Sequence, residues 1–144
     1  MMVGYRQKNR EGTLDSANLA AGVDAMLDGR FDASNHYYPL RVQYEDTDAG
    51  GIVYHAQYLA FAERARSAWL RCLDIDQSAM LADNGLGFVV RRIEVDFHLP
   101  AGLGDILDVE TGLLRLGGVS LKLQQKIINR ENRHILARLV VDIG

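Results

Sequence analysis

A short acidic segment followed by a pair of glycines holds the side chains of this sequence that are best suited to chemistry. Glu45, Asp46 and Asp48 lie close together, and Gly50 and Gly51 come soon after them. Glycine adopts tight and positive-φ conformations easily, so a compact loop can hold these carboxylates in a fixed place. A loop carboxylate can attack an acyl carbon, or it can take a proton from the water that does.

A helix is expected directly after this loop, and its N-terminus would complete a site. Residues 56–73 carry apolar side chains at three- and four-residue steps. These side chains are Tyr58, Phe61, Ala62, Ala65, Ala68, Trp69 and Cys72. The first turn of a helix presents unpaired N–H groups and the positive end of the helix dipole. With His55 at the helix start, these groups can stabilise a developing oxyanion, and the combination predicts acyl chemistry.

Each of these side chains also has an ordinary structural interpretation, and spacing alone leaves both open. Asp48 can make an Asx-turn or cap the helix, as aspartate beside glycine commonly does. Asp46 can be the active group instead, and in an extended segment its carboxylate would point the same way as that of Asp48. His55 can act as an acid or base, or simply pack at the helix start. Tyr44 can orient Asp48 through its hydroxyl, or pack in the core.

Other candidate sites are weaker. Glu63 on the helix could be a base, but its spacing from Arg66 favours a surface ion pair or a dimer contact. Cys72 lies on the apolar stripe and is expected to be a buried, inert thiol. The histidines are too scattered to suggest zinc, and the acidic run lacks the glutamate that closes an EF-hand loop. No metal is therefore expected.

The resemblance of this chain to a known family rests on residues 44–55, which read YEDTDAGGIVYH, and on the ERAR run at 63–66 behind them. Together with Tyr58 and Leu59, these residues resemble the signature of the 4-hydroxybenzoyl-CoA thioesterase family. Within that family the chain is most similar to the bacterial acyl-CoA thioesterases associated with the Tol–Pal system. The resemblance runs from about Tyr38 to the C-terminus. It implies a hotdog fold, assembled as a homodimer or homotetramer.

The resemblance also implies a reaction and roles for single residues. The residue that matches Asp48 is the catalytic carboxylate, as nucleophile or general base, and Asp46 is structural. The position of His55 supplies a backbone N–H to the thioester oxygen. The implied reaction is hydrolysis of an acyl-CoA thioester to the free acid and coenzyme A, which belongs to the substrate, so no further cofactor is expected. Alternatives are a binding module for acyl-CoA or acyl carrier protein, and a hotdog acyl hydratase.

A substrate of this size brings phosphates, which require positive charge. Arg91 and Arg92 are the candidates for the coenzyme A phosphates, although exposed strand arginines often serve only solubility. Arg64 and Lys122 are further, equally weak candidates.

Alternating apolar side chains predict the elements that must hold this site. Strands are expected from about residue 36 to 45 and at 88–98, 107–113, 119–127 and 135–143, with a turn at Gly117 and Gly118. One long helix and five strands in meander order give an α+β domain. With the resemblance, we expect a central helix wrapped by a five-stranded antiparallel sheet over residues 36–144. Residues 1–35 are expected to be a partly disordered extension, with a short helix at 13–27 and a linker at 30–35.

Composition narrows the class of protein without identifying a function. The 144 residues carry a net charge of -3 and are 48% hydrophobic, which suits one soluble globular domain. The mild acidity argues against nucleic-acid binding. No apolar run approaches the ~20 residues that span a bilayer, and no signal peptide is expected. A single cysteine favours a reducing cytoplasm.

Overall fold

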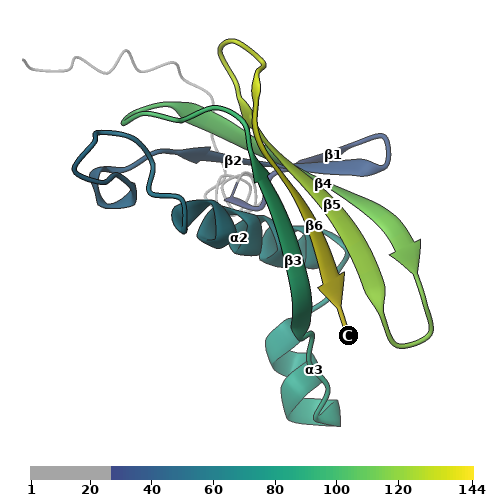
Figure 1. Ribbon diagram of the computed structural model, residues 1–144. Helices are drawn as coiled ribbons and strands as arrows, with labels where there is room; N and C mark the ends of the chain where they lie inside the picture. Colours follow the sequence, from purple (N-terminus) through teal and green to yellow (C-terminus); the bar gives the residue numbers. More distant parts are fainter. Residues whose placement is uncertain (1–26) are drawn as a thin grey trace, which may run out of the picture.

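The structure of this chain is a computed structural model that describes residues 27–144. The helix expected at residues 13–27 lies outside the described residues, apart from its last position. Figure 1 shows one curved antiparallel sheet lying across one long helix, with a short helix at one end. No helix among residues 27–144 is long and apolar enough to cross a membrane.

Six strands form the sheet, in the order β1-β2-β4-β5-β6-β3. Their bounds are Arg30–Asp32 (β1), Asn35–Arg41 (β2), Val90–Phe97 (β3), Ile106–Leu116 (β4), Leu121–Asn129 (β5) and Ile135–Ile143 (β6). The helices are α2 (Gln57–Cys72) and α3 (Gln77–Asn84), and Tyr44–Asp46 forms the 3-10 turn η1. The α+β class is confirmed, but the predicted meander order was wrong, because β2 pairs with β4 and β3 crosses over to pair with β6. Strands β1 and β3 are therefore the two edges of the sheet.

The strand count of five was wrong by one, because residues 30–35 are not a linker. Strand β1 pairs antiparallel with β2, with Arg30 opposite Tyr37 and Asp32 opposite Asn35. The turn between them places Ala33 at φ 54°. An alanine in the left-handed region gives no turn signal in the sequence, where glycine or asparagine would have done so.

Helix α2 provides the apolar face on which the sheet closes. Phe61, Ala62, Ala65 and Ala68 are fully buried, and the first three belong to one core cluster with side chains of β4, β5 and β6. Small side chains at 62, 65 and 68 allow the helix to approach the sheet closely. The helix predicted at 56–73 is therefore confirmed to within one residue at each end.

A polar network crosses this apolar interface. Arg66 is buried, and it donates from Nη1 to Oε1 of Gln125 at 2.9 Å while its Nη2 pairs with Glu63. Gln125 in turn donates to the Ala62 carbonyl and to Oγ1 of Thr111, both at 3.0 Å. The ion pair expected on the surface thus has its arginine inside, where only hydrogen bonds to protein groups can satisfy the guanidinium.

The end of α2 is also bound to the start of the described chain. Nε2 of His36 donates to the Asp28 carbonyl at 2.7 Å, and Arg71 forms an ion pair with the Asp28 carboxylate at 2.8 Å. The Cys72 thiol donates to the same carbonyl at 3.5 Å, and burial raises its pKa. Cys72 is only partly buried, so the expectation of a fully buried thiol was wrong. Residues before 36 therefore take part in the fold, although the boundary proposed at 35/36 remains a prediction.

We predict that Gln125→Leu destabilises the protein, because Nη1 of the buried Arg66 loses its acceptor, which leaves Glu63 as the remaining partner of the guanidinium, and the Ala62 carbonyl loses the Gln125 donor. The loss of a hydrogen-bond partner from a buried polar atom costs about 1–3 kcal/mol of unfolding free energy. Urea unfolding followed by circular dichroism measures this loss. Gln124→Leu is the matched control, since Gln124 is the neighbouring residue on the other face of β5 and is only partly buried. Equal stability of the two variants would contradict the role of the network.

We predict that stability falls as the pH drops below about 6.5, the ordinary pKa of histidine. Burial lowers the pKa of His36, and the hydrogen bond to the Asp28 carbonyl and the charge of the Asp28 carboxylate offset this lowering only in part. The Nδ1 atom of His36 has no hydrogen-bond partner among the described residues. The unfolded chain therefore takes up its proton at a higher pH than the folded chain, so stability is complete above pH 6.5 and declines below it.

The variant His36→Gln keeps a donor for the Asp28 carbonyl but cannot titrate. Thermal unfolding between pH 8 and pH 5 should show a smaller decline for this variant than for the parent protein. His134→Gln, at an exposed histidine, should leave the decline unchanged. An unchanged decline in His36→Gln would assign the pH dependence to other groups.

Candidate active site

The loop that carries Asp48 is held by its own backbone hydrogen bonds. Thr47 and Val53 form an antiparallel bridge, and the Asp48 N–H donates to the Ile52 carbonyl at 2.9 Å. The Gly51 N–H donates back to the Asp48 carbonyl at 3.0 Å. Gly51 has φ 78°, a conformation that glycine adopts without strain. Asp48 therefore stands at the start of a tight turn, in the segment between β2 and α2, that is closed by an isolated bridge.

The Asp48 side chain is exposed and only partly engaged. Its Oδ1 accepts a hydrogen bond from the Gly50 N–H at 2.8 Å, which is the Asx-turn that the sequence left open. Its Oδ2 accepts no hydrogen bond from the described residues. The turn thus orients the carboxylate but occupies only one of its oxygens. The second oxygen remains available to attack a carbon or to accept a proton.

Asp46 is placed quite differently, and the expectation of two parallel carboxylates was wrong. Asp46 lies in η1 and is 2% exposed, and its Oδ2 accepts from the Gln43 N–H at 2.8 Å. Its carbonyl accepts from the Tyr54 N–H at 2.9 Å. The 3-10 turn replaces the extended backbone, so one carboxylate points inward and the other outward. Asp46 is built into the base of the loop.

The start of α2 lies beside this loop and offers free donors. His55 is exposed, with its ring 4.5 Å from that of Tyr54 and edge-on to that of Phe97 at 6.3 Å. The N–H groups of His55 and Ala56 make no hydrogen bond within the described part of the chain. Together with the helix dipole, such groups form an environment that favours negative charge on a ligand oxygen.

Tyr44 lies in η1 and is 82% exposed. Its carbonyl accepts from Thr47, through the N–H at 3.2 Å and through Oγ1 at 2.7 Å. Its hydroxyl makes no hydrogen bond to Asp48 within residues 27–144, so the orienting role of Tyr44 remains a prediction.

Arg91 and Arg92 lie at the far end of β3 from the loop. Both are exposed, and Arg92 forms an ion pair with Glu94. The strand continues to Phe97, which contacts His55, so the two arginines stand roughly 15–20 Å from the start of α2 at ~3.3 Å per residue. The folded chain therefore does not bring these arginines to Asp48.

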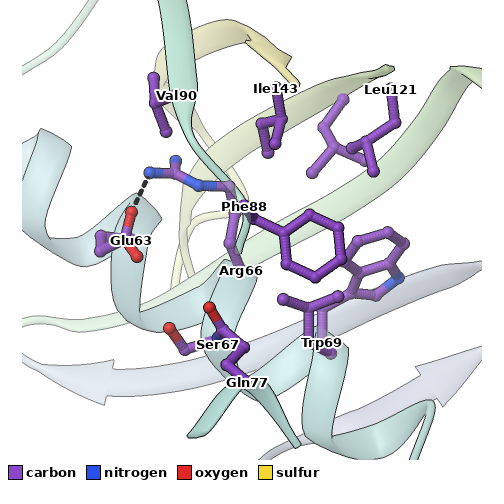
Figure 2. A pocket seen from close by; sticks show the side chains of 11 residues that line it. Glu63, Arg66, Ser67, Trp69, Gln77, Phe88, Val90, Leu121 and Ile143 are labelled. Carbon is purple, nitrogen blue, oxygen red and sulfur yellow. Dashed lines mark hydrogen bonds and ion pairs between the residues drawn. The ribbon is translucent and has the colours of Figure 1, made fainter. Parts of the chain in front are cut away.

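A separate cavity of about 70 Å³ lies between the second half of α2 and the sheet. Figure 2 shows its lining side chains, including the aromatic rings of Phe88 and Trp69, with the Glu63–Arg66 ion pair on one side. Its residues on α2 begin at Glu63, two turns of helix beyond His55, so the cavity is distinct from the Asp48 loop.

Sequence reasoning missed the aromatic partners of the helix start. Phe97 is edge-on to both His55 and Tyr58, with ring centroids 5.5 Å apart in the second pair. Period two predicts that Phe97 faces one side of its strand, but nothing in the sequence says that this end of β3 meets the start of α2.

No group of three or more histidine, cysteine, aspartate or glutamate side chains among residues 27–144 could hold a metal ion.

Comparison with known proteins shows the family to which this chain belongs. Residues 50–135 match the family described as the thioesterase superfamily. An acyl-CoA thioester hydrolase YbgC of Escherichia coli is 48% identical over 95 residues, which cover 66% of this chain and 70% of that protein. An acyl-CoA thioesterase YbgC of Haemophilus influenzae is 41% identical over 119 residues, or 83% of this chain and 82% of that one.

A solved structure extends the match to the fold. The crystal structure of a probable thioesterase from Bartonella henselae superposes with a TM-score of 0.72 at 35% identity, covering 76% of this chain and 90% of that one. The predicted wrapping of the sheet around α2 is thus confirmed as the hotdog arrangement of thioesterases. The family match begins at Gly50, so it does not test the role of Asp48. The chain belongs to the thioesterase superfamily and is a thioester hydrolase.

Proposed function

We propose that this thioesterase hydrolyses acyl-CoA thioesters, and that Asp48 is the carboxylate that acts on them. The names of the similar proteins from Escherichia coli and Haemophilus influenzae support the acyl-CoA substrate. The observation that carries the role of Asp48 is its exposed carboxylate with one oxygen free, on the loop that leads into the unpaired N–H groups of His55 and Ala56.

Two routes are compatible with this geometry. As a nucleophile, a carboxylate oxygen of Asp48 attacks the acyl carbon, and the carbon–sulfur bond breaks to release the coenzyme A thiolate and leave a mixed anhydride. Water then hydrolyses the anhydride to the free acid and the Asp48 carboxylate, and the proton released from water protonates the thiolate. As a general base, Asp48 takes a proton from water, whose oxygen attacks the acyl carbon while the thiolate leaves and is protonated. In both routes the N–H groups of His55 and Ala56 stabilise the negative charge on the thioester oxygen.

The remaining parts of the proposal concern the partners of the site. Arg91 and Arg92 are proposed to bind the phosphates of coenzyme A, at the end of β3 away from the loop. Tyr44 is proposed to orient Asp48 once substrate is bound. In neither proposed route does a cofactor take part beyond the coenzyme A of the substrate. Acyl carrier protein is proposed as a second carrier of the acyl group. The proposed location of the protein is the cytoplasm.

We also propose that the protein works as a homodimer or homotetramer. Among residues 27–144, strand β3 pairs with β6 alone, and its other backbone edge has no partner strand. An open edge invites pairing with another strand. Phe97 on this strand is 52% exposed beside His55, so a partner at this edge would cover the start of α2. Substrate would then bind where two subunits meet.

We predict that Asp48→Asn lowers the rate of thioester hydrolysis by ~10²–10⁴ or more, because the amide can neither attack nor take a proton. The thermal midpoint should hardly change, since the amide oxygen of asparagine can still accept from the Gly50 N–H. Release of coenzyme A, followed with a thiol reagent, measures the rate. The substrate is the best of a panel of short aliphatic, aromatic and long-chain thioesters.

Asp46→Asn is the matched control for this variant. It should cost much less activity, because the Asp46 side chain points into the base of the loop and its amide oxygen can still accept from Gln43. Near-normal turnover of Asp48→Asn would refute the mechanism. Unfolding of Asp48→Asn would instead mean that the carboxylate is needed for the loop itself.

We predict that sedimentation of the active protein gives a mass of at least twice the 16.0 kDa of one chain. The reason is the open edge of β3 and the exposed aromatic side chain beside it. The measurement should be made across a range of concentrations while hydrolysis is followed on the same samples. A stable, fully active species of 16.0 kDa would show that one chain is sufficient.

A further inference from the structure

Tyr58 is held rigidly in the first turn of α2. Its side chain is 3% exposed, and its ring is edge-on to Phe61 at 6.1 Å and to Phe97 at 5.5 Å. Edge-on aromatic pairs fix the plane of a ring as well as its place. The direction of the Tyr58 hydroxyl is therefore set by neighbours on both α2 and β3.

This hydroxyl meets the loop between β3 and β4. The Ala101 N–H donates to the Tyr58 hydroxyl oxygen at 3.2 Å, and Ala101 is fully buried. A buried N–H has no water to replace a lost partner, so the hydroxyl is the acceptor on which this group depends. Burial also raises the pKa of Tyr58, which keeps the hydroxyl neutral.

The same short loop holds the far side of the Asp48 turn. The Ala101 carbonyl accepts from the Val53 N–H at 2.9 Å, and Gly102 forms an antiparallel bridge with Ile52. The Ile52 carbonyl in turn accepts from the Asp48 N–H at 2.9 Å. A continuous series of hydrogen bonds thus runs from the hydroxyl on α2 to the backbone of Asp48.

The loop has a second anchor at its other end. Asp105 accepts from the Gly102 N–H through Oδ2 and from the Val42 N–H through its carbonyl, both at 2.9 Å. These bonds attach the loop to the start of β4 without any contribution from Tyr58. Loss of the Tyr58 hydroxyl should therefore shift the Ala101 end of the loop and leave the fold in place.

We infer that Tyr58 is a positioning residue for Asp48, which its hydroxyl holds in register with the free N–H groups at the start of α2. This inference rests on the proposed role of Asp48. Because both ends of the site are fixed from the same helix, one hydroxyl sets the distance between the acting carboxylate and the donors that stabilise the oxyanion. A small displacement of a catalytic group is enough to lower a rate greatly.

The test compares four proteins: the parent, Tyr58→Phe, Asp48→Asn and the double variant. Tyr58→Phe keeps the ring and its aromatic contacts, and should lower kcat by about tenfold to a hundredfold. KM should stay within about twofold, because the hydroxyl does not touch substrate. The double variant should be no slower than Asp48→Asn alone, since a positioning residue has nothing to position once the carboxylate is gone.

Tyr37→Phe is the matched control. The Tyr37 hydroxyl donates to Glu110 at 2.7 Å between β2 and β4, away from the loop, so its removal should leave kcat unchanged. Thermal midpoints of all variants establish that they are folded.

The outcomes separate this inference from the proposed function. Full activity of Tyr58→Phe while Asp48→Asn is slow overturns the role of Tyr58 alone. Multiplying losses in the double variant also overturn it, because Tyr58 would then act independently of Asp48. Full activity of Asp48→Asn overturns the proposed function and this role with it. Unfolding of Tyr58→Phe would make the hydroxyl a structural group and overturn the inference as well.

Discussion

The close packing of α2 against the sheet is the constraint on which the rest of this structure depends. Alanine at 62, 65 and 68 lets the helix backbone approach the strands, and each of these residues is fully buried. Because the sheet curves around this face, the direction and the position of the helix are fixed together (Figure 1). The N-terminus of α2, with its unpaired donors, is therefore held in a fixed position beside the end of β3.

The polar network inside this interface adds specificity to the packing. An apolar helix face can slide on a sheet at modest cost, whereas a buried guanidinium has few places where it is satisfied. Arg66 finds Gln125 on β5 and Glu63 on its own helix, and Gln125 is joined to Thr111 on β4. These bonds fix the rotation of α2, and with it the direction in which Tyr58 and His55 point.

Periodicity in the sequence was enough to predict most helices and strands of this framework, but not the order of the strands, because the pairing of β3 with β6 joins segments that are far apart in the chain. Apolar residues three or four positions apart predict helix α2, and apolar residues two positions apart predict the strands from β2 onward. These spacings reflect which side of a helix or strand faces the core. Strand β1 was not predicted, because the turn that follows it contains Ala33 in place of glycine or asparagine. The conformation of the Asp48 loop could not be predicted for a different reason. It depends on the bridge of Ile52 to Gly102 and on the hydrogen bond of Val53 to Ala101, residues some fifty positions away that carry no local signal.

The two interpretations of Asp48 that the sequence left open prove to be compatible. The Asx-turn is present, but it uses one carboxylate oxygen and leaves the other facing solvent. A turn of this kind restricts the rotamers of the side chain, and under the proposed mechanism this lowers the entropy that must be lost on reaching a reactive geometry. The turn that makes Asp48 look like an ordinary turn residue thus leaves one carboxylate oxygen exposed, which is compatible with the proposed catalytic role. Local structural chemistry near an exposed carboxylate is therefore poor grounds for rejecting a catalytic role.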